Sequence, residues 1–160
     1  MKCGNKYCKE TWDIHTNNRI LKLHPTIQCS VKRFINEVEE TYNMKIRITD
    51  TYRTYTEQDE LYKQGRSKAG KIITNAKGGY SYHNFGLAID VVEIKDKKAN
   101  YDVSVTKKIA PIAKKHGLAW GGDWKSFKDY PHFDMTFNKT TEELRKLVKE
   151  YGDYKKIPLE

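Results

Sequence analysis

Apolar and polar residues recur with two different periods in the first third of the chain. Over 26–42 the apolar residues return at helical spacing, and Pro25 suits the first turn of a helix. Over 45–53 the residues alternate instead, so that Ile46 and Ile48 share one face. The pattern therefore predicts a helix followed by a short strand.

The remainder of the chain alternates between helical and strand patterns. Thr56, with Asp59 three residues on, resembles a capping box in which Asp replaces Glu, and Gly65 suits the end of that helix. Pro111 lies inside a later helical pattern and marks either its start or a kink. The other predicted elements are a loop over 66–80, a strand over 86–94, a helix that stops at His116 before Gly117, a strand over 131–137, and a final helix capped by Thr140 or Thr141.

Helices and short strands mix here without the regular spacing of βαβ units. This order predicts an α+β fold with a small, mainly antiparallel sheet flanked by helices. The 160 residues predict a single domain over 1–160, with 1–18 as a polar lead-in and 151–160 as a C-terminal tail.

The composition is that of a globular protein with a polar surface, with 38% hydrophobic and 32% charged residues. No apolar run approaches the roughly 20 residues that cross a bilayer, so no membrane span is expected. The first residues lack the apolar core of a secretory signal peptide. We therefore expect synthesis in the cytoplasm and a separate release route for any action outside it.

The net charge of +9 is informative about binding partners and not about the fold. Nucleic acid and an anionic bacterial wall are two possible partners, and an evenly spread, solubilising excess of lysine is the alternative. There is no block of five or more Lys or Arg residues. A nucleic-acid partner is therefore not expected.

The three cysteines form no CxxC pair. Cys3 and Cys8 are close enough in sequence for a weak metal or disulfide pair. The spacing favours instead three free thiols in a reduced cytosol, with Cys29 as the third.

Asp90 is an anomaly in the middle of a strand that is apolar on both faces. Such a strand is buried on both sides, and a buried carboxylate is costly unless it is paired or binds a metal. His83 lies seven residues earlier, with Gly86 allowing a turn between them. An Asp on a strand and a His on the loop that feeds it form two convergent ligands.

His132 is the third candidate ligand. Strand alternation places His132 and Asp134 on one face, with Phe133 and Met135 on the other. Two imidazoles and one carboxylate suit a catalytic zinc with an open fourth position. The alternative is that one histidine is a buried core residue and Asp90 is an ion-pair partner; the pattern alone favours neither reading.

Asp129 lies three residues before His132, across a turn that contains Pro131. From there its carboxylate can approach the open metal position and act as a general base. A plain turn residue is the alternative.

Two runs of the chain resemble a known family. SYHNFGLAID (81–90) resembles the SxHxxGxAxD motif of the D-alanyl-D-alanine carboxypeptidase and L-alanyl-D-glutamate endopeptidase family, and WGGDW (120–124) followed by DYPHF (129–133) is similar to its second motif. TYR at 51–53, with LY at 61–62 and GR at 65–66, resembles the upstream segment. The similarity runs from about Leu21 to Phe137 and implies a Hedgehog/D,D-peptidase-like fold.

The resemblance also implies residue roles in a zinc peptidase that cuts peptidoglycan stem peptides. Asp129 matches the general base. Arg53 matches an arginine that binds substrate and stabilises the developing oxyanion, and a surface salt bridge is the alternative. The matching zinc ligands are His83, Asp90 and His132.

Further residues of the motifs have weaker implied roles. Ser81 matches the serine of the first motif and is expected near the metal or substrate, or in a plain turn role. Trp124 is expected to wall the cleft with Trp120, unless these rings only fill the core. Asp123 and Asp134 are rival candidates to orient a ligand histidine from behind. A loop cap is the alternative for Asp123. The remaining histidines match no motif and are expected to be structural or exposed: His15, His24 and His116.

The second motif is most similar to that of L-alanyl-D-glutamate endopeptidases, which include phage endolysins. The predicted function is therefore a monomeric peptidoglycan endopeptidase, released by a holin-type route if phage-encoded. One rival is a D,D-carboxypeptidase that removes terminal D-alanine. Another is a non-catalytic module that binds the wall or nucleic acid, which an intact Asp129 beside all three ligands argues against.

Overall fold

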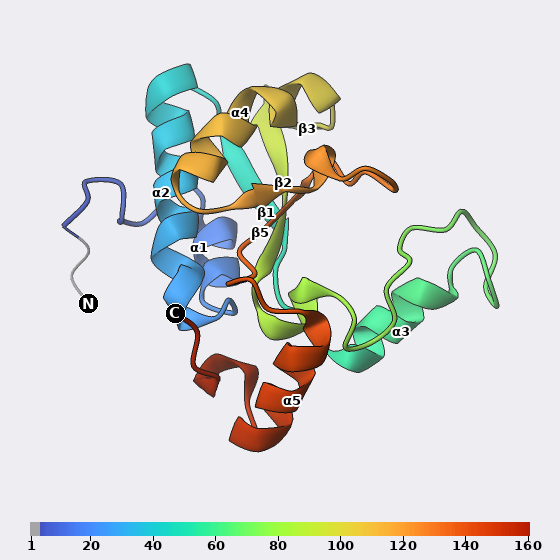
Figure 1. The fold of residues 1–160 in the computed structure, drawn as a ribbon. Helices are drawn as coiled ribbons and strands as arrows, with labels where there is room; N and C mark the ends of the chain where they lie inside the picture. The colour runs from blue at the N-terminus through green and yellow to red at the C-terminus, as the bar shows by residue number, and fades with distance from the viewer. Residues whose placement is uncertain (1–3) are drawn as a thin grey trace.

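The centre of the protein is a small sheet in which every pair of neighbouring strands is antiparallel. The computed structural model describes residues 4–160. Strand neighbours follow the order β1-β2-β5-β4, and β3 pairs with β2 (Figure 1). The strands are β1 Ile46–Asp50, β2 Ala88–Lys95, β3 Lys98–Asn100, β4 Ala119–Trp120 and β5 His132–Asp134. The predicted α+β class with an antiparallel sheet is confirmed.

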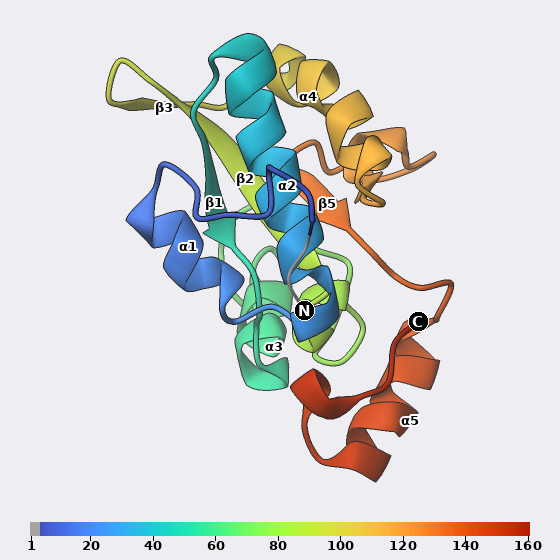
Figure 2. The same ribbon diagram turned by 90° about the vertical axis from the view of Figure 1, so that its left-hand side faces the viewer.

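Helices surround this sheet, and two of them, α2 and α4, lie against each other on one side of it (Figures 1 and 2). Helix α2 buries an apolar stripe that includes Phe34, whose ring lies 5.1 Å from that of Phe133 on β5. Burial of a side chain of this kind contributes about 1.5–3 kcal/mol. No helix among residues 4–160 has the length and apolar character needed to span a membrane. The helices are α1 Ile14–Ile20, α2 Pro25–Tyr42, α3 Tyr55–Lys63, α4 Val103–Lys115 and α5 Thr141–Tyr151.

Most predicted helices have the expected bounds. Pro25 occupies the start of α2, and Thr140 caps α5 in a complete capping box with Glu143. Helix α4 runs through Pro111 from an N-cap at Asp102, so Pro111 does not mark its start.

The predicted cap of α3 is wrong by two residues. The N-cap is Thr54, whose side chain accepts from the backbone N–H of Glu57, and the Glu57 carboxylate accepts in return from the N–H of Thr54 at 2.8 Å. Glutamate is long enough to reach back to the cap, which completes both halves of the box. Asp59 serves elsewhere and accepts from the backbone N–H of Gly78 at 2.7 Å.

Within residues 4–18 and 151–160, the chain makes more contacts with the domain than the sequence predicted. Asp13 caps α1 inside the expected lead-in, and its carboxylate also accepts two hydrogen bonds from Arg47 at 2.9 Å. At the other end, Ile157 and Leu159 are buried in the core, and Tyr154 stacks on Tyr52 with ring centroids 4.0 Å apart. The segment 151–160 is therefore packed against the domain instead of forming a tail.

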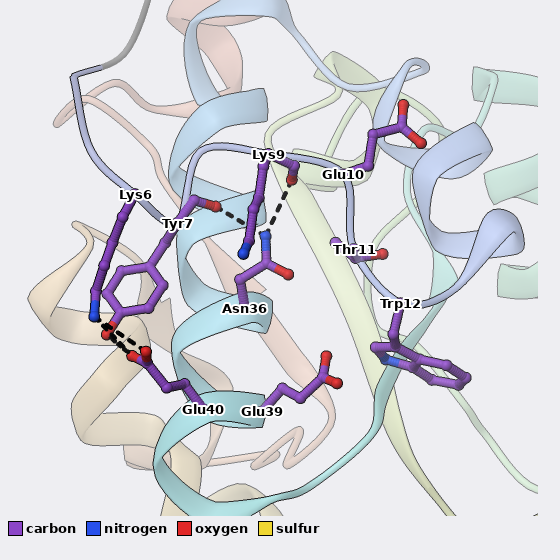
Figure 3. A pocket seen from close by; sticks show the side chains of 9 residues that line it. All are labelled: Lys6, Tyr7, Lys9, Glu10, Thr11, Trp12, Asn36, Glu39 and Glu40. Atoms are coloured by element: carbon purple, nitrogen blue, oxygen red, sulfur yellow. Dashed lines mark hydrogen bonds and ion pairs between the residues drawn. The ribbon is translucent and has the colours of Figure 1, made fainter.

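A disulfide between Cys8 and Cys29 corrects the expectation of free thiols. It ties the N-terminal segment to α2, and the Asn36 amide strengthens this attachment by donating to the carbonyls of Tyr7 and Lys9 at 2.8 and 3.0 Å (Figure 3). The sequence could not pair Cys8 with Cys29 because the chain folds back along α2 only in the tertiary structure. Cys3 lies outside the described residues.

Reduction of this disulfide is expected to lower the free energy of unfolding by about 2–4 kcal/mol, because a bridge that closes a loop of 21 residues restricts the unfolded chain. Urea unfolding with and without reductant measures the difference. A Cys8→Ser, Cys29→Ser double variant is the control and should not respond to reductant. Equal thiol reactivity of the native and the reduced protein would show that the bridge is absent.

Candidate metal centre and active-site cleft

The register of the sheet brings three polar residues into one row. Asp90 of β2 lies opposite His132 of β5 on one side and Asp50 of β1 on the other. Directly opposed residues of an antiparallel pair share a face. The register of β1 shifts between Ile48 and Asp50, so Ile48 remains buried in the core while Asp50 lines a cleft beside Asp90.

His83 reaches the same place from the 3-10 turn Tyr82–Phe85. Its ring Nδ1 lies 2.6 Å from the carbonyl oxygen of Thr51 and donates there, so Nε2 is the ring nitrogen that points toward Asp90. That Nε2 lies 3.4 Å from Asp90 Oδ1. Gly86 ends the turn at φ 65°, where a Cβ would lie 2.7 Å from the backbone nitrogen of His24. Only glycine allows this sharp return into β2.

His132 is oriented in the complementary way. Its Nε2 donates to Asp134 Oδ2 at 2.7 Å, and its Nδ1 faces Asp90 Oδ1 at 3.6 Å. Asp134 therefore supplies the orienting carboxylate behind a candidate ligand, a common arrangement around zinc. Its rival Asp123 is exposed and forms an ion pair with Lys114 at 2.6 Å, so that expectation for Asp123 is wrong.

The three candidate ligands leave a place that suits a cation. One ligand atom from each of His83, Asp90 and His132 lies within 4.8 Å of the others. His83 Nε2 and Asp90 Oδ1 are buried and make no hydrogen bond, although buried polar atoms in native proteins nearly always do. A metal ion with two nitrogen ligands and one oxygen ligand satisfies both atoms, and this set fits zinc.

Charges at this cluster favour the ionised carboxylate. Burial of Asp90 opposes ionisation, but its attraction to His83 and His132 outweighs burial and lowers its pKa. Burial of His132 disfavours its charged form and by itself would lower its pKa. The interactions of His132 with Asp134 and Asp90 are stronger, and they raise its pKa to about 9 in the metal-free protein. A metal must displace this proton, so its binding weakens as the pH falls below that value.

Asp129 approaches the cluster from the segment between β4 and β5. Its backbone N–H donates to the carbonyl of Gly121 at 3.1 Å, and its own carbonyl accepts from the N–H of His132 at 3.3 Å. A Cβ on Gly121 would lie 2.3 Å from the Asp129 carbonyl oxygen, so glycine is required for this approach. Burial raises the pKa of Asp129, and the charge of Asp90 raises it further. Both effects make Asp129 a better proton acceptor.

Arg53 is held against the cluster by three partners. Its Nη2 donates to Asp90 Oδ2 at 3.2 Å, its Nη1 donates to Gln58 at 2.9 Å, and its Nε donates to Asp50. A guanidinium has five N–H donors, so two remain beyond these bonds between described residues. The structure thus gives Arg53 a part in orienting Asp90 that the sequence did not predict.

Several residues that position the site were not predicted. Asn84, which is buried, accepts from the N–H groups of Gly79 and Ser81 and donates to the carbonyl of Arg53 at 3.0 Å. The Asn84 side chain therefore connects the His83 turn to the Arg53 segment by hydrogen bonds. Gln58, fully buried on α3, joins Arg53 to the carbonyl of Ala76 at 2.9 Å. Gln58 lies on the inward face of α3, where an apolar residue is expected. A polar residue at such a position is the signal by which the sequence could have indicated it.

The cleft in front of the cluster has a volume of about 730 Å³. It contains the predicted metal ligands together with Asp129, Arg53, Ser81 and Trp124, brought from segments far apart in the chain. Trp120, which was expected to wall the cleft, is buried and does not line it. Ser81 lines it and also caps the His83 turn, its hydroxyl accepting from the His83 N–H at 3.3 Å. The predicted site residues on its wall are Arg53, Ser81, His83, Asp90, Trp124, Asp129 and His132.

Comparison with known proteins shows the family to which the chain belongs. The profile of a family described as D-alanyl-D-alanine carboxypeptidase matches residues 74–135. The peptidoglycan L-alanyl-D-glutamate endopeptidase CwlK of Bacillus subtilis is 39% identical over an alignment of 148 residues, and the match covers 82% of this chain and 87% of CwlK. The chain belongs to this peptidase family. The predicted family and hydrolase class are thereby confirmed. The His83, Asp90 and His132 cluster agrees with the predicted zinc cofactor, while the role of each residue stays a prediction.

Two further proteins described as L-alanyl-D-glutamate peptidases are similar to this chain. The L-alanyl-D-glutamate peptidase of Listeria phage A118 is 32% identical over 101 residues, covering 61% of this chain but only 33% of the phage protein. The crystal structure of the L-Ala D-Glu endopeptidase ChiX of Serratia marcescens matches with a TM-score of 0.60 at 22% identity, covering 78% of this chain and 88% of ChiX. The second likeness confirms the D,D-peptidase-like fold.

The other histidines of the peptidase lie away from the cluster. His24 is buried at the start of α2, where its Nδ1 accepts from the N–H of Thr26 and its Nε2 donates to the carbonyl of Ile157. His116 pairs with Glu37 between α4 and α2, and His15 is exposed on α1. All three agree with the prediction of structural or exposed histidines.

A second hollow, of about 430 Å³, lies between the N-terminal segment and α2 (Figure 3). It offers no imidazole, and its Glu40 is neutralised by Lys6 at 3.1 Å. Within residues 4–160 the His83, Asp90 and His132 group is the single cluster arranged to hold a metal.

Asp134→Ala is expected to weaken zinc binding by about 10–100-fold, the usual cost of losing a partner that orients a ligand imidazole. Competition with a fluorescent zinc chelator measures the dissociation constant. Asp96→Asn, in the exposed turn between β2 and β3, is the control. Unchanged zinc affinity in the Asp134 variant would contradict the orienting role.

Proposed function

We propose that this peptidase hydrolyses the L-alanyl–D-glutamate bond of peptidoglycan stem peptides, with a zinc ion held by His83, Asp90 and His132. The observation that carries the proposal is the meeting of these three side chains, two with unpaired buried atoms, in a cleft that also contains Asp129. The similarity to CwlK over most of both chains supports the choice of bond.

The chemistry is divided between the metal and two side chains. When bound, zinc acts as a Lewis acid that polarises the substrate carbonyl and lowers the pKa of water to about 7. Asp129, partly buried in the cleft, takes the proton from the attacking water and later gives it to the leaving nitrogen. Its raised pKa suits both steps, because a carboxylate that is too acidic accepts a proton poorly.

Arg53 stabilises the negative charge that develops on the carbonyl oxygen. Three bonds, to Asp50, Gln58 and Asp90, hold the guanidinium rigid at the cleft wall, and its remaining donors are available to the substrate. A donor that is already in place costs little reorganisation when the charge forms.

A D,D-carboxypeptidase that removes terminal D-alanine is the second candidate function. The description of the matched family profile favours it. VanYB, solved in complex with D-alanine-D-alanine, resembles this chain with a TM-score of 0.55, but at 15% identity that likeness concerns the fold alone.

Product analysis on purified, cross-linked peptidoglycan decides between the two. The proposal predicts soluble fragments with a new N-terminal D-glutamate, loss of this product after chelation, and its recovery on addition of zinc. Free D-alanine as the product would establish the carboxypeptidase. Equal release by the Asp129→Asn variant would remove Asp129 from the mechanism, and equal release after chelation would contradict the role of zinc.

The cell wall is the proposed place of action, and a phage endolysin is one setting that the Listeria phage relative supports. In that setting a holin-type route would release the enzyme, and a monomer is the proposed state. Static light scattering of the purified enzyme over a range of concentrations tests the monomer, since a constant mass near 18.8 kDa is expected.

A further inference from the structure

Four large apolar side chains remain exposed around the cleft. Ile73 and Tyr80, which are 47% and 56% exposed, come from the loop that follows α3. Trp124 and Phe127, which are 39% and 49% exposed, come from the segment between β4 and β5. Both segments extend to the same side of the sheet in Figure 1. Exposed apolar side chains that gather at one cleft mark a binding surface.

Trp124 differs from its neighbour Trp120 in a way that indicates a ligand. Trp120 is buried, and its indole N–H donates to the carbonyl of Tyr130 at 2.7 Å. Trp124 is more than a third exposed, its indole N–H makes no hydrogen bond to another described residue, and its ring centroid lies 5.0 Å from that of His132. An aromatic ring with a free polar edge beside a catalytic centre is suited to an amphipathic ligand.

Phe127 supports the same conclusion from its backbone. Its φ of 49° lies in the left-handed region, which a bulky residue seldom adopts. Strained backbone of this kind persists mostly at functional sites. Here the strained residue holds a half-exposed phenyl ring on the cleft wall that it shares with Trp124.

The proposed substrate places a sugar within reach of these rings. The L-alanine nitrogen of a stem peptide is acylated by the lactyl group of N-acetylmuramic acid. The lactyl group takes the place of one more residue, so the sugar ring begins roughly 7 Å from the scissile carbonyl, at about 3.3–3.6 Å per extended residue. The pyranose presents apolar C–H faces and polar edges, which match an indole face and its free N–H.

We propose that Trp124, assisted by Phe127, binds the N-acetylmuramoyl residue next to the scissile bond. The peptidase then selects stem peptides that are still attached to the glycan over free peptides. This inference rests on the proposed endopeptidase function and specifies its substrate. The cleft is large enough for both parts, because about 730 Å³ lies in the upper part of the roughly 300–1,000 Å³ typical of small-ligand sites.

Two synthetic substrates test the inference. One is N-acetylmuramoyl-L-alanyl-γ-D-glutamyl-L-lysine, and the other carries an acetyl group in place of the muramoyl group. The wild type is expected to show a kcat/KM about tenfold or more higher for the muramoyl substrate, a preference that corresponds to about 1.4 kcal/mol. Trp124→Ala should lose this preference through KM, Trp124→Phe should keep most of it, and the exposed Tyr101→Ala should keep all of it.

The outcomes separate the inference from the function on which it rests. Equal cleavage of both substrates by the wild type, or an equal loss on both in Trp124→Ala, would overturn the inference and leave the endopeptidase intact. If Tyr80→Ala loses the preference for the muramoyl substrate and Trp124→Ala keeps it, the sugar binds at the opposite wall of the cleft. That result would also overturn the inference. Cleavage of neither substrate at the L-alanyl–D-glutamate bond would overturn both. Zinc content equal to that of the wild type shows that the Trp124 variant keeps His132 in place.

Discussion

Asp129→Asn is expected to lower kcat by about 10²–10⁴-fold, the usual contribution of a positioned general acid–base group. Asparagine has nearly the same shape but cannot take the proton of the attacking water. Its side chain is not among the three candidate ligands, so zinc content should remain equal to that of the wild type. Rates on soluble wall fragments and metal analysis of the same sample measure both quantities.

The control for this variant is Asp123→Asn, the same change at an exposed carboxylate of the same segment. It should leave kcat unchanged. The pH profile provides a second test, because Asp129 must be ionised to act as a base. Burial raises its pKa, so kcat/KM of the wild type should fall as the pH drops through that raised pKa, and this acid limb should vanish in the variant. Full activity of Asp129→Asn would remove Asp129 from the mechanism.

His83→Ala is expected to lose zinc and activity together. The variant removes one of three protein ligands, so zinc affinity should fall by more than the roughly 10–100-fold cost of losing an orienting partner. Without the metal, water keeps its ordinary pKa near 15.7 instead of about 7, and hydrolysis should fall to background. Metal analysis after dialysis, together with a chelator competition assay, measures the loss.

His15→Ala, at an exposed position of α1, is the matched control and should retain both zinc and activity. Circular dichroism checks that His83→Ala still folds. If it does not, a zinc titration of the metal-free wild type at pH 6 and pH 8 still tests the site, because the raised pKa of His132 requires tighter zinc binding at the higher pH. Stoichiometric zinc in a folded His83→Ala variant would refute the ligand set.

Local signals were strong enough to predict most of the elements. The apolar stripe of α2, the two-sided apolar run of β2 and the cap at Thr140 are readable from neighbouring residues alone, because helix and strand periods are local properties. The short α1 was missed because only Thr16 and Ile20 are buried in its seven residues, which leaves almost no period to detect.

Pairings between distant segments could not be predicted in this way. The Cys8–Cys29 disulfide and the burial of Ile157 and Leu159 depend on where the two chain ends fold back onto the domain. Such contacts depend on the tertiary packing, and no local pattern records them.

For the site, the sequence by itself determined the chemistry: a carboxylate that is out of place in an apolar strand, and histidines in motifs with a fixed spacing. Only the tertiary structure decided which atoms meet. The register of β2 against β5 sets Asp90 opposite His132, and the shifted register of β1 brings Asp50 to the cleft. The Thr51 carbonyl and Asp134 decide which nitrogen of each ring faces Asp90. The physical reason is that residue types set which ligands are available, whereas strand register and hydrogen bonds across the fold set where those ligands point.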